Sequence, residues 1–177
     1  DTAIVIRELQ SRYGERIVYR TNPVRAGLAK SIAEGIANAS YSHCLVRDSD
    51  WNHEIGILPE FRRAMDRDFV IASRYVNGVP PLRRGNDVFS LVLNWFLRLR
   101  FGSVTDWTYG YFLLRRRLLE SLPLDLVFRG RGEYTVRLYR GLLDRGIAPL
   151  EIPTAVQRRG HGKSTTSLFR HGWPYLR

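Results

Sequence analysis

The stretch HCLVRDSDWNH, residues 43–53, decides the fold because it joins an apolar run to a turn with two carboxylates. Residues 43–47 show no alternation of apolar and polar side chains. This pattern is typical of a strand that is buried on both faces in the centre of a parallel sheet. In open α/β sheets, ligands bind outside the carboxyl ends of the strands. We therefore expect Asp48 and Asp50 to lie at the ligand-binding edge of a sheet.

The flanking sequence alternates between the periodicities of helices and strands. We expect the whole chain of 177 residues to be a single α/β domain with a mainly parallel central sheet flanked by helices. A Gly- and Pro-rich loop is expected at residues 76–85. Helical spacing predicts helices at residues 2–13, 27–39, 54–66, 86–100, 115–121 and 133–145, and short apolar runs predict strands at 16–20, 43–47, 69–73, 107–114 and 147–156.

The charge of the chain predicts an anionic partner. Lys and Arg number 28 against 17 Asp and Glu, a formal net charge of +11. Nucleic acid, anionic lipid and phosphorylated substrates all satisfy this charge. A basic nucleic-acid-binding domain is thus one alternative, but the chain carries none of the standard nucleic-acid-binding motifs. The single cysteine, Cys44, excludes an internal disulfide and favours a reducing compartment.

Membrane contact is the other question that hydropathy raises. No apolar run reaches the length of a bilayer-spanning helix, so the chain as given is not expected to cross a membrane. The amphipathic helix at residues 86–100 could lie on a membrane surface. An ordinary core helix explains the same pattern equally well.

The turn at residues 48–50 favours hard divalent cations. Two carboxylates one residue apart suit Mg²⁺ or Mn²⁺, which also bind diphosphate oxygens. Such an ion would neutralise the charge that develops on a nucleotide leaving group. A solvated turn that caps the following helix is the alternative explanation of Asp48 and Asp50.

Several blocks along the chain together resemble one family. They match, in order, segments of dolichol-phosphate mannosyltransferases and related polyprenyl-phosphate glycosyltransferases of glycosyltransferase family 2. The third-last to last residues of the fourth block, and its central Tyr109, fall on the pattern D-x-T-S-G-F-R, where the family has Ser at the position of Tyr109. The blocks are NPVRAGLAKSIAEGIANA (22–39), RDSDWNHEIGILPEF (47–61), IASRYVNG (71–78), DWTYGYF (106–112) and IAPLEIPTAVQRRGHGKS (147–164).

This resemblance implies a GT-A (Rossmann-like) fold, a nucleotide-sugar donor, Mg²⁺ or Mn²⁺, and a polyprenyl-phosphate lipid acceptor at a membrane surface, with no nucleic acid. Transfer of a hexose is expected, with mannose from GDP-mannose favoured. Transfer of glucose or another sugar to undecaprenyl phosphate or to a non-lipid acceptor is the alternative. The resemblance also implies that the first strand and most of the first acidic motif are missing before Asp1. The expected location is the cytoplasmic face of a membrane, peripheral or anchored by segments outside this chain.

The resemblance assigns the donor side as follows. Asp48 and Asp50 match the ligands of the metal and the diphosphate, and Asp50 is also counted as catalytic. Asn52 falls where many relatives have a Gln that reaches the metal. Arg25 and Asp1 match donor-binding positions, although a solvated helix-start Arg explains Arg25 nearly as well.

On the acceptor side, the resemblance suggests one catalytic group and a set of phosphate ligands. Asp106 matches a position that acts as a base or orients other groups, with a strand-start cap as the alternative. His53 is either a helix-entry hydrogen bonder or catalytic. For Arg74, a structural salt bridge is the alternative to phosphate binding. The spacing of Arg84 and the Thr at position 165 depart from the family pattern. The expected acceptor-phosphate ligands are Arg74, Arg84, Ser90, Arg159 and Ser164.

Overall fold

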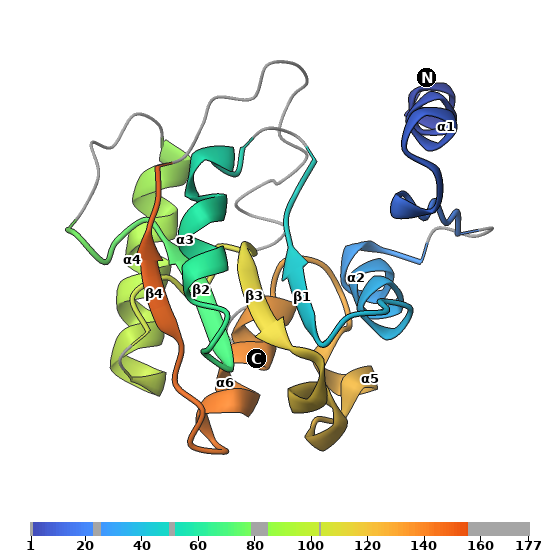
Figure 1. Ribbon diagram of the computed structural model, residues 1–177. Coiled ribbons are helices and arrows are strands. Elements are labelled where there is room, and N and C mark those ends of the chain that lie inside the picture. The colour runs from blue at the N-terminus through green and yellow to red at the C-terminus, as the bar shows by residue number, and fades with distance from the viewer. Residues whose placement is uncertain (1, 23–25, 50–51, 79–84, 103, 156–177) are drawn as a thin grey trace.

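The computed structural model describes residues 2–22, 26–49, 52–78, 85–102 and 104–155. Its centre is a four-stranded sheet of order β1-β3-β2-β4 (Figure 1). β3 runs antiparallel to β1 and to β2, whereas β4 runs parallel to β2. β1, β2 and β4 therefore point in one direction, and their carboxyl ends lie at the same edge. The strands are β1 (His43–Val46), β2 (Phe69–Ser73), β3 (Phe112–Arg115) and β4 (Leu150–Pro153).

Helices cover both faces of this sheet, so the expected α/β class is confirmed, with a sheet that is mixed because of β3. Short 3₁₀ segments precede or follow several of the helices. The α-helices are α1 (Thr2–Tyr13), α2 (Leu28–Ala37), α3 (Leu58–Arg63), α4 (Gly85–Phe101), α5 (Leu124–Val127) and α6 (Tyr134–Leu143), and the 3₁₀ segments are η1 (Gly14–Arg16), η2 (Ile55–Ile57) and η3 (Arg116–Ser121).

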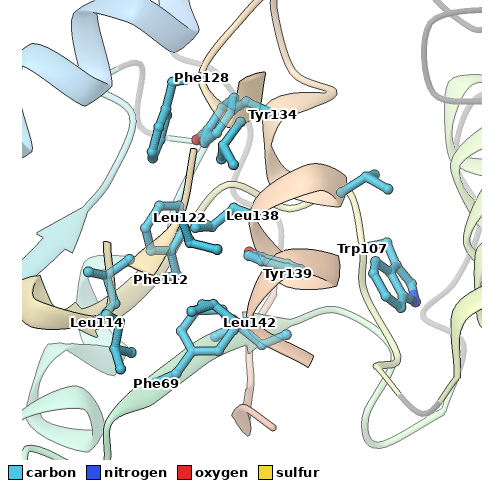
Figure 2. Close-up of a cluster of buried hydrophobic side chains, with 14 of the residues drawn as sticks. Phe69, Trp107, Phe112, Leu114, Leu122, Phe128, Tyr134, Leu138, Tyr139 and Leu142 are labelled. Carbon is cyan, nitrogen blue, oxygen red and sulfur yellow. The ribbon is translucent and has the colours of Figure 1, made fainter. Parts of the chain in front are cut away.

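The core has two parts, one on each face of the sheet. Successive residues of a strand point to opposite faces, and every residue of β2 is buried. Phe69 and Ile71 share the larger cluster with α2, α4 and α6, whereas Val70 shares the smaller cluster with Phe61 of α3. Figure 2 shows part of the larger cluster, where the Tyr139 ring of α6 lies 5.3 Å from that of Phe69.

The N-terminal segment stands apart from this core. The helix predicted at residues 2–13 is confirmed, but none of its residues is buried, and Figure 1 shows α1 away from the sheet. The strand predicted at residues 16–20 is wrong: η1 ends at Arg16, and residues 17–20 have no regular structure. An extended segment becomes a strand only when a neighbouring strand supplies hydrogen bonds, and none of the described strands pairs with it.

Other differences concern boundaries and position in the sheet. The strand at residues 43–47 was expected in the centre, but β1 is an edge strand of the described sheet, with Leu45 exposed. The strand predicted at residues 107–114 begins only at Phe112. Residues 104–111 before it instead form an irregular segment, and this segment carries much of the candidate site. Burial raises the pKa of the Cys44 thiol, against a smaller opposing effect of Arg116, as expected for an inert buried cysteine.

Candidate active site at the carboxyl edge of the sheet

The segments that leave β1, β2 and β4 meet at one edge of the sheet. The backbone N–H of Thr154, just after β4, donates to the carbonyl of Ser73 at 3.0 Å. Glu54, in the segment after β1, accepts a hydrogen bond from the N–H of Ala155 at 3.1 Å. These bonds hold the three exits together. The edge therefore gathers side chains that are far apart in sequence, as the α/β rule for ligand sites requires.

His53 organises the turn that follows β1. Its side chain is only 3% exposed, and Nδ1 accepts the backbone N–H of Asp48 at 3.0 Å. Nδ1 is therefore unprotonated, and in the neutral ring the proton is on Nε2, which lies 3.8 Å from Asp48 Oδ2. The ring also stacks on Tyr111 with the centroids 4.8 Å apart. This burial favours the helix-entry hydrogen bonder over a catalytic role for His53.

Arg74, the first residue after β2, is paired with Asp106. Its Nε donates to Asp106 Oδ2 at 2.6 Å and its Nη2 to Oδ1 at 2.8 Å, a bidentate pair. The backbone N–H of Arg74 also donates to Oδ2, at 3.1 Å. Asp106 is fully buried, whereas 16% of the Arg74 side chain is exposed. The salt-bridge explanation of Arg74 is thus correct as to contacts, and it leaves part of the guanidinium facing outward.

The buried carboxylate of Asp106 is fully used by the protein. Besides Arg74, Oδ1 accepts the backbone N–H of Thr108 at 3.3 Å. A base must reach the proton that it removes, and both oxygens of Asp106 are directed at Arg74. Of the two roles expected for Asp106, this geometry favours the orientation of other groups.

Helix α4 supplies the rest of the Arg74 site. Ser90 Oγ and Thr108 Oγ1 accept hydrogen bonds from Arg74 Nη2 at 3.0 and 2.9 Å. Asn94, one turn after Ser90, accepts the backbone N–H of Trp107 at 2.6 Å and donates to Thr108 at 3.1 Å. Nη1 of Arg74 takes part in none of these bonds, so it is the nitrogen best placed for an anion.

The electrostatics of this site keep Arg74 charged. Burial disfavours the charged guanidinium, but the adjacent charge and hydrogen bonds of Asp106 outweigh it and raise the pKa of Arg74 above its ordinary value. The guanidinium carbon lies 5.0 Å from the ring centroid of Tyr75 and 4.9 Å from that of Tyr109. Both rings stabilise the cation through their π faces. Arg74 is therefore a permanent, oriented positive charge at this edge.

A second polar network supports the irregular segment from behind. Both carboxylate oxygens of Glu151, on β4, accept the backbone N–H of Thr105, at 2.9 and 3.2 Å. The Thr105 hydroxyl also donates to Glu151 and lies 2.5 Å from Ser73 Oγ. Sequence reasoning missed Glu151, Thr105 and Thr108, because only the fold brings β4 beside the segment before β3. Thr108 had a signal, since it falls on the Thr of the D-x-T pattern.

The residues of the turn suit a divalent metal as far as they are described. The Asp48 side chain is 44% exposed, and a carboxylate oxygen is a ligand that Mg²⁺ and Mn²⁺ prefer. The backbone around Asp48 is held by His53, so this oxygen is presented from a fixed turn. The carbonyl of Asn52 is occupied by the Tyr109 hydroxyl at 3.2 Å. Within the described ranges, no three His, Cys, Asp or Glu side chains form a metal-binding group.

Part of the predicted site cannot be placed in this way. Of the predicted site residues, the structure brings Arg74, Ser90 and Asp106 into one cluster, with Asp48 and Asn52 in the adjoining turn. The remaining predicted residues lie outside the described residues, namely Asp1, Arg25, Asp50, Arg84, Arg159 and Ser164.

The family follows from a comparison of the sequence with family models. The model described as Glycosyl transferase family 2 matches residues 1–123. The chain belongs to glycosyl transferase family 2. It is therefore a glycosyltransferase with a GT-A fold, as the ordered motifs predicted. The match includes the turn after β1 and the whole Arg74 cluster.

Relatives of this family 2 chain differ in what they act on. It is 26% identical over 126 residues to the dolichol-phosphate mannosyltransferase of Pyrococcus furiosus, which covers 67% of this chain and 35% of that protein. The chain thus spans about a third of the length of that curated relative.

Solved structures support the GT-A fold. Glucosyl-3-phosphoglycerate synthase from Mycobacterium tuberculosis, in complex with uridine diphosphate, aligns with a TM-score of 0.55 at 20% identity, over 77% of this chain and 49% of that chain. The same enzyme with Mn²⁺, uridine diphosphate and glucosyl-3-phosphoglycerate aligns with a TM-score of 0.56 at 23% identity, over 88% of this chain and 53% of that chain. At these identities the likeness establishes the fold alone.

Proposed function

We propose that this glycosyltransferase transfers a hexose from a nucleotide sugar to the phosphate of a polyprenyl-phosphate lipid, with mannose from GDP-mannose as the favoured donor. The observation that carries the proposal is the outward part of Arg74, a buried and permanently charged guanidinium at the same sheet edge as the Asp48 turn. A metal-binding turn and a fixed cation at one edge suit a reaction between two anionic substrates.

Each side of the site has a separate task in this proposal. Asp48 and Asp50 would hold Mg²⁺ or Mn²⁺, with Asn52 nearby, and Arg25 and Asp1 would contact the donor. The bound metal would neutralise the charge on the departing nucleoside diphosphate. The Mn²⁺ and uridine diphosphate bound by the M. tuberculosis synthase support this choice of cofactor.

On the acceptor side, Arg74 would hold the acceptor phosphate through Nη1, with Arg84, Arg159 and Ser164 completing the phosphate site. Ser90 and Asp106 fix the orientation of Arg74 through the bonds described above. A phosphate oxygen is already ionised at neutral pH, so its attack on the sugar requires no strong base. The buried Asp106 therefore serves the reaction by orienting Arg74, and the enzyme works mainly by positioning the two anions.

Helix α4 supports a lipid rather than a soluble acceptor. Its buried face carries Ser90 and Asn94, but its outer face is a stripe of apolar side chains with exposed fractions between 45 and 68%. We define this α4 stripe as Val88, Val92, Trp95, Phe96 and Leu99. Arg98 and Arg100 follow in the last turn. An apolar stripe flanked by Arg matches a helix that rests in a membrane interface, so we place the enzyme at the cytoplasmic face of a membrane. Within the described ranges, no helix has the length and apolar character needed to cross a bilayer.

The test is a matrix of donors and acceptors with the full-length protein and Mn²⁺ or Mg²⁺. GDP-mannose and UDP-glucose are offered with a polyprenyl phosphate or with 3-phosphoglycerate, and sugar transfer is followed by release of the nucleoside diphosphate. We expect turnover with GDP-mannose and the polyprenyl phosphate, and its loss on removal of the metal with a chelator. Turnover only with 3-phosphoglycerate would refute the lipid acceptor and favour the soluble alternative.

Two substitutions connect this activity to the turn. Asp48→Ala and Asp50→Ala should each lower kcat by about a hundredfold or more, because each removes a proposed metal ligand whose electrostatic effect is greatest in the transition state. Asp66→Ala is the matched control, since Asp66 is an exposed aspartate whose side chain is paired only with Arg67 at 3.8 Å. Full activity of Asp50→Ala would disprove the metal mechanism.

A further inference from the structure

Tyr109 lies between the two halves of the candidate site. It belongs to the irregular segment before β3, and its side chain is buried. On one side its ring meets that of His53 edge-on, with the centroids 4.6 Å apart. On the other side the guanidinium carbon of Arg74 lies 4.9 Å from the ring centroid. One aromatic ring therefore contacts both the turn after β1 and the fixed cation after β2.

The hydroxyl of Tyr109 adds a directional bond to these ring contacts. Its Oη donates to the backbone carbonyl of Asn52 at 3.2 Å. Burial raises the pKa of Tyr109 above its ordinary value, and the charge of Arg74 opposes this only in part. The phenol therefore stays protonated, and remains a donor, throughout the pH range in which the protein is handled. Asn52 in turn precedes His53, whose Nδ1 holds the N–H of Asp48.

The position of Tyr109 is itself held rigidly. Its backbone carbonyl accepts the buried hydroxyl of Tyr139 at 2.9 Å, which ties the segment to α6 and the core. The sequence pattern of the family has Ser at this position, and a Ser side chain is too short to span from Asn52 to Arg74. The bridge is thus a property of this chain that the family resemblance does not supply.

We infer that Tyr109 is a positioning residue that holds the Asp48 turn at a fixed distance from Arg74, so that a divalent cation at the turn and a phosphate at Arg74 are bound in register. The roles of the two ends rest on the proposed function. The bridge itself rests on the ring contacts and on the Asn52 bond, and it can be tested without turnover.

Two variants separate the hydroxyl from the ring. Tyr109→Phe removes only the bond to Asn52, and should weaken Mn²⁺ binding by about fivefold while leaving the affinity for inorganic phosphate within about twofold. Tyr109→Leu also removes the π face beside Arg74, and should weaken phosphate binding by about fivefold as well. Both affinities are measured by calorimetry on the full-length protein.

A matched control separates positioning from loss of core packing. Phe61 lies in the same core cluster and contacts Tyr111, with the ring centroids 4.9 Å apart. Phe61→Leu therefore also removes a buried ring from this cluster, but it should leave both affinities unchanged. Equal losses of affinity in Phe61→Leu and Tyr109→Leu would overturn the inference, as would unchanged affinities in both Tyr109 variants.

Hydrogen exchange provides a readout that needs no ligand. In Tyr109→Leu, the amides of residues 48–49 and 52–54 should exchange faster than in the wild type, and in Phe61→Leu they should not. If the wild-type protein binds neither Mn²⁺ nor phosphate, the proposed function fails, and the exchange data still decide whether Tyr109 holds the turn. Unchanged exchange in Tyr109→Leu would refute the bridge while leaving the proposed function intact.

Discussion

At the scale of single residues, the site depends on a buried ion pair whose members are 32 positions apart in the chain. Arg74 and Asp106 were each predicted as functional residues, but their pairing follows from the fold. The pair places Asp106 behind Arg74, where it holds the guanidinium. A buried charge is tolerated only when its partner and hydrogen bonds are present, so this pair should affect stability as well as activity.

Asp106→Ala should lower the free energy of unfolding by about 3–5 kcal/mol, because it leaves the largely buried Arg74 charge without its partner. Urea denaturation of the full-length protein measures this change. The control is Asp68→Ala, which removes an aspartate that is 43% exposed and is paired with Arg115 and Arg117 on the surface. Surface pairs contribute at most about 1 kcal/mol. Equal effects of the two substitutions would contradict the importance assigned to the buried pair.

At the scale of elements, α4 has two apolar faces with different environments. Leu93 and Leu97 are buried against the core, together with Asn94, which holds the segment before β3. The α4 stripe on the opposite side is exposed. Sequence periodicity predicted an amphipathic helix at residues 86–100 and allowed either a core or an interfacial role. The structure shows that one face is core, and it leaves the stripe for the interfacial role that we propose.

The two faces of α4 should respond differently to truncation. Leu97→Ala should lower the free energy of unfolding by about 2–5 kcal/mol, because Leu97 is completely buried and its loss leaves a cavity. Leu99→Ala, on the stripe and 68% exposed, should change it by no more than about 0.5 kcal/mol. Urea denaturation compares the two directly. A strongly destabilising Leu99→Ala would mean that the stripe is covered within the folded protein.

At the scale of the whole molecule, charge and the α4 stripe suggest the same kind of partner. The formal net charge of +11 attracts anionic lipid headgroups, and the stripe offers apolar side chains to the layer beneath them. Neither feature depends on the identity of the sugar. Membrane attachment can therefore be tested separately from catalysis.

The protein should bind vesicles of mixed phosphatidylcholine and phosphatidylglycerol more tightly than vesicles of phosphatidylcholine alone, and added salt should weaken this binding because it screens the charges. Cosedimentation measures the bound fraction. A Trp95→Ser, Leu99→Ser double variant should bind less. Leu126→Ser, which changes an exposed leucine of α5, should bind as the wild type does. Equal binding by the double variant and the wild type would exclude the stripe as the contact surface.

The sequence by itself determined the α/β class, most helices and strands, and the polar turn after β1. These features are local, because periodicity and turn residues depend on neighbours within a few positions. The same local reasoning placed Arg74 after β2 and Asp106 before β3. It failed at residues 16–20, where strand formation needs a partner strand, and at residues 107–111, where the side chains of Thr108 and Tyr109 have tertiary partners.

Only the tertiary structure decided how these residues act together. It directs Asp106 to Arg74, places Glu151 of β4 against Thr105, and sets Tyr109 between Asn52 and Arg74. Such contacts join segments that are distant in sequence, and their geometry depends on the order of the strands in the sheet. The turn with Asp48 and Asp50 was visible in the sequence, whereas its link to Arg74 through Tyr109 exists only because the chain folds β3 between β1 and β2.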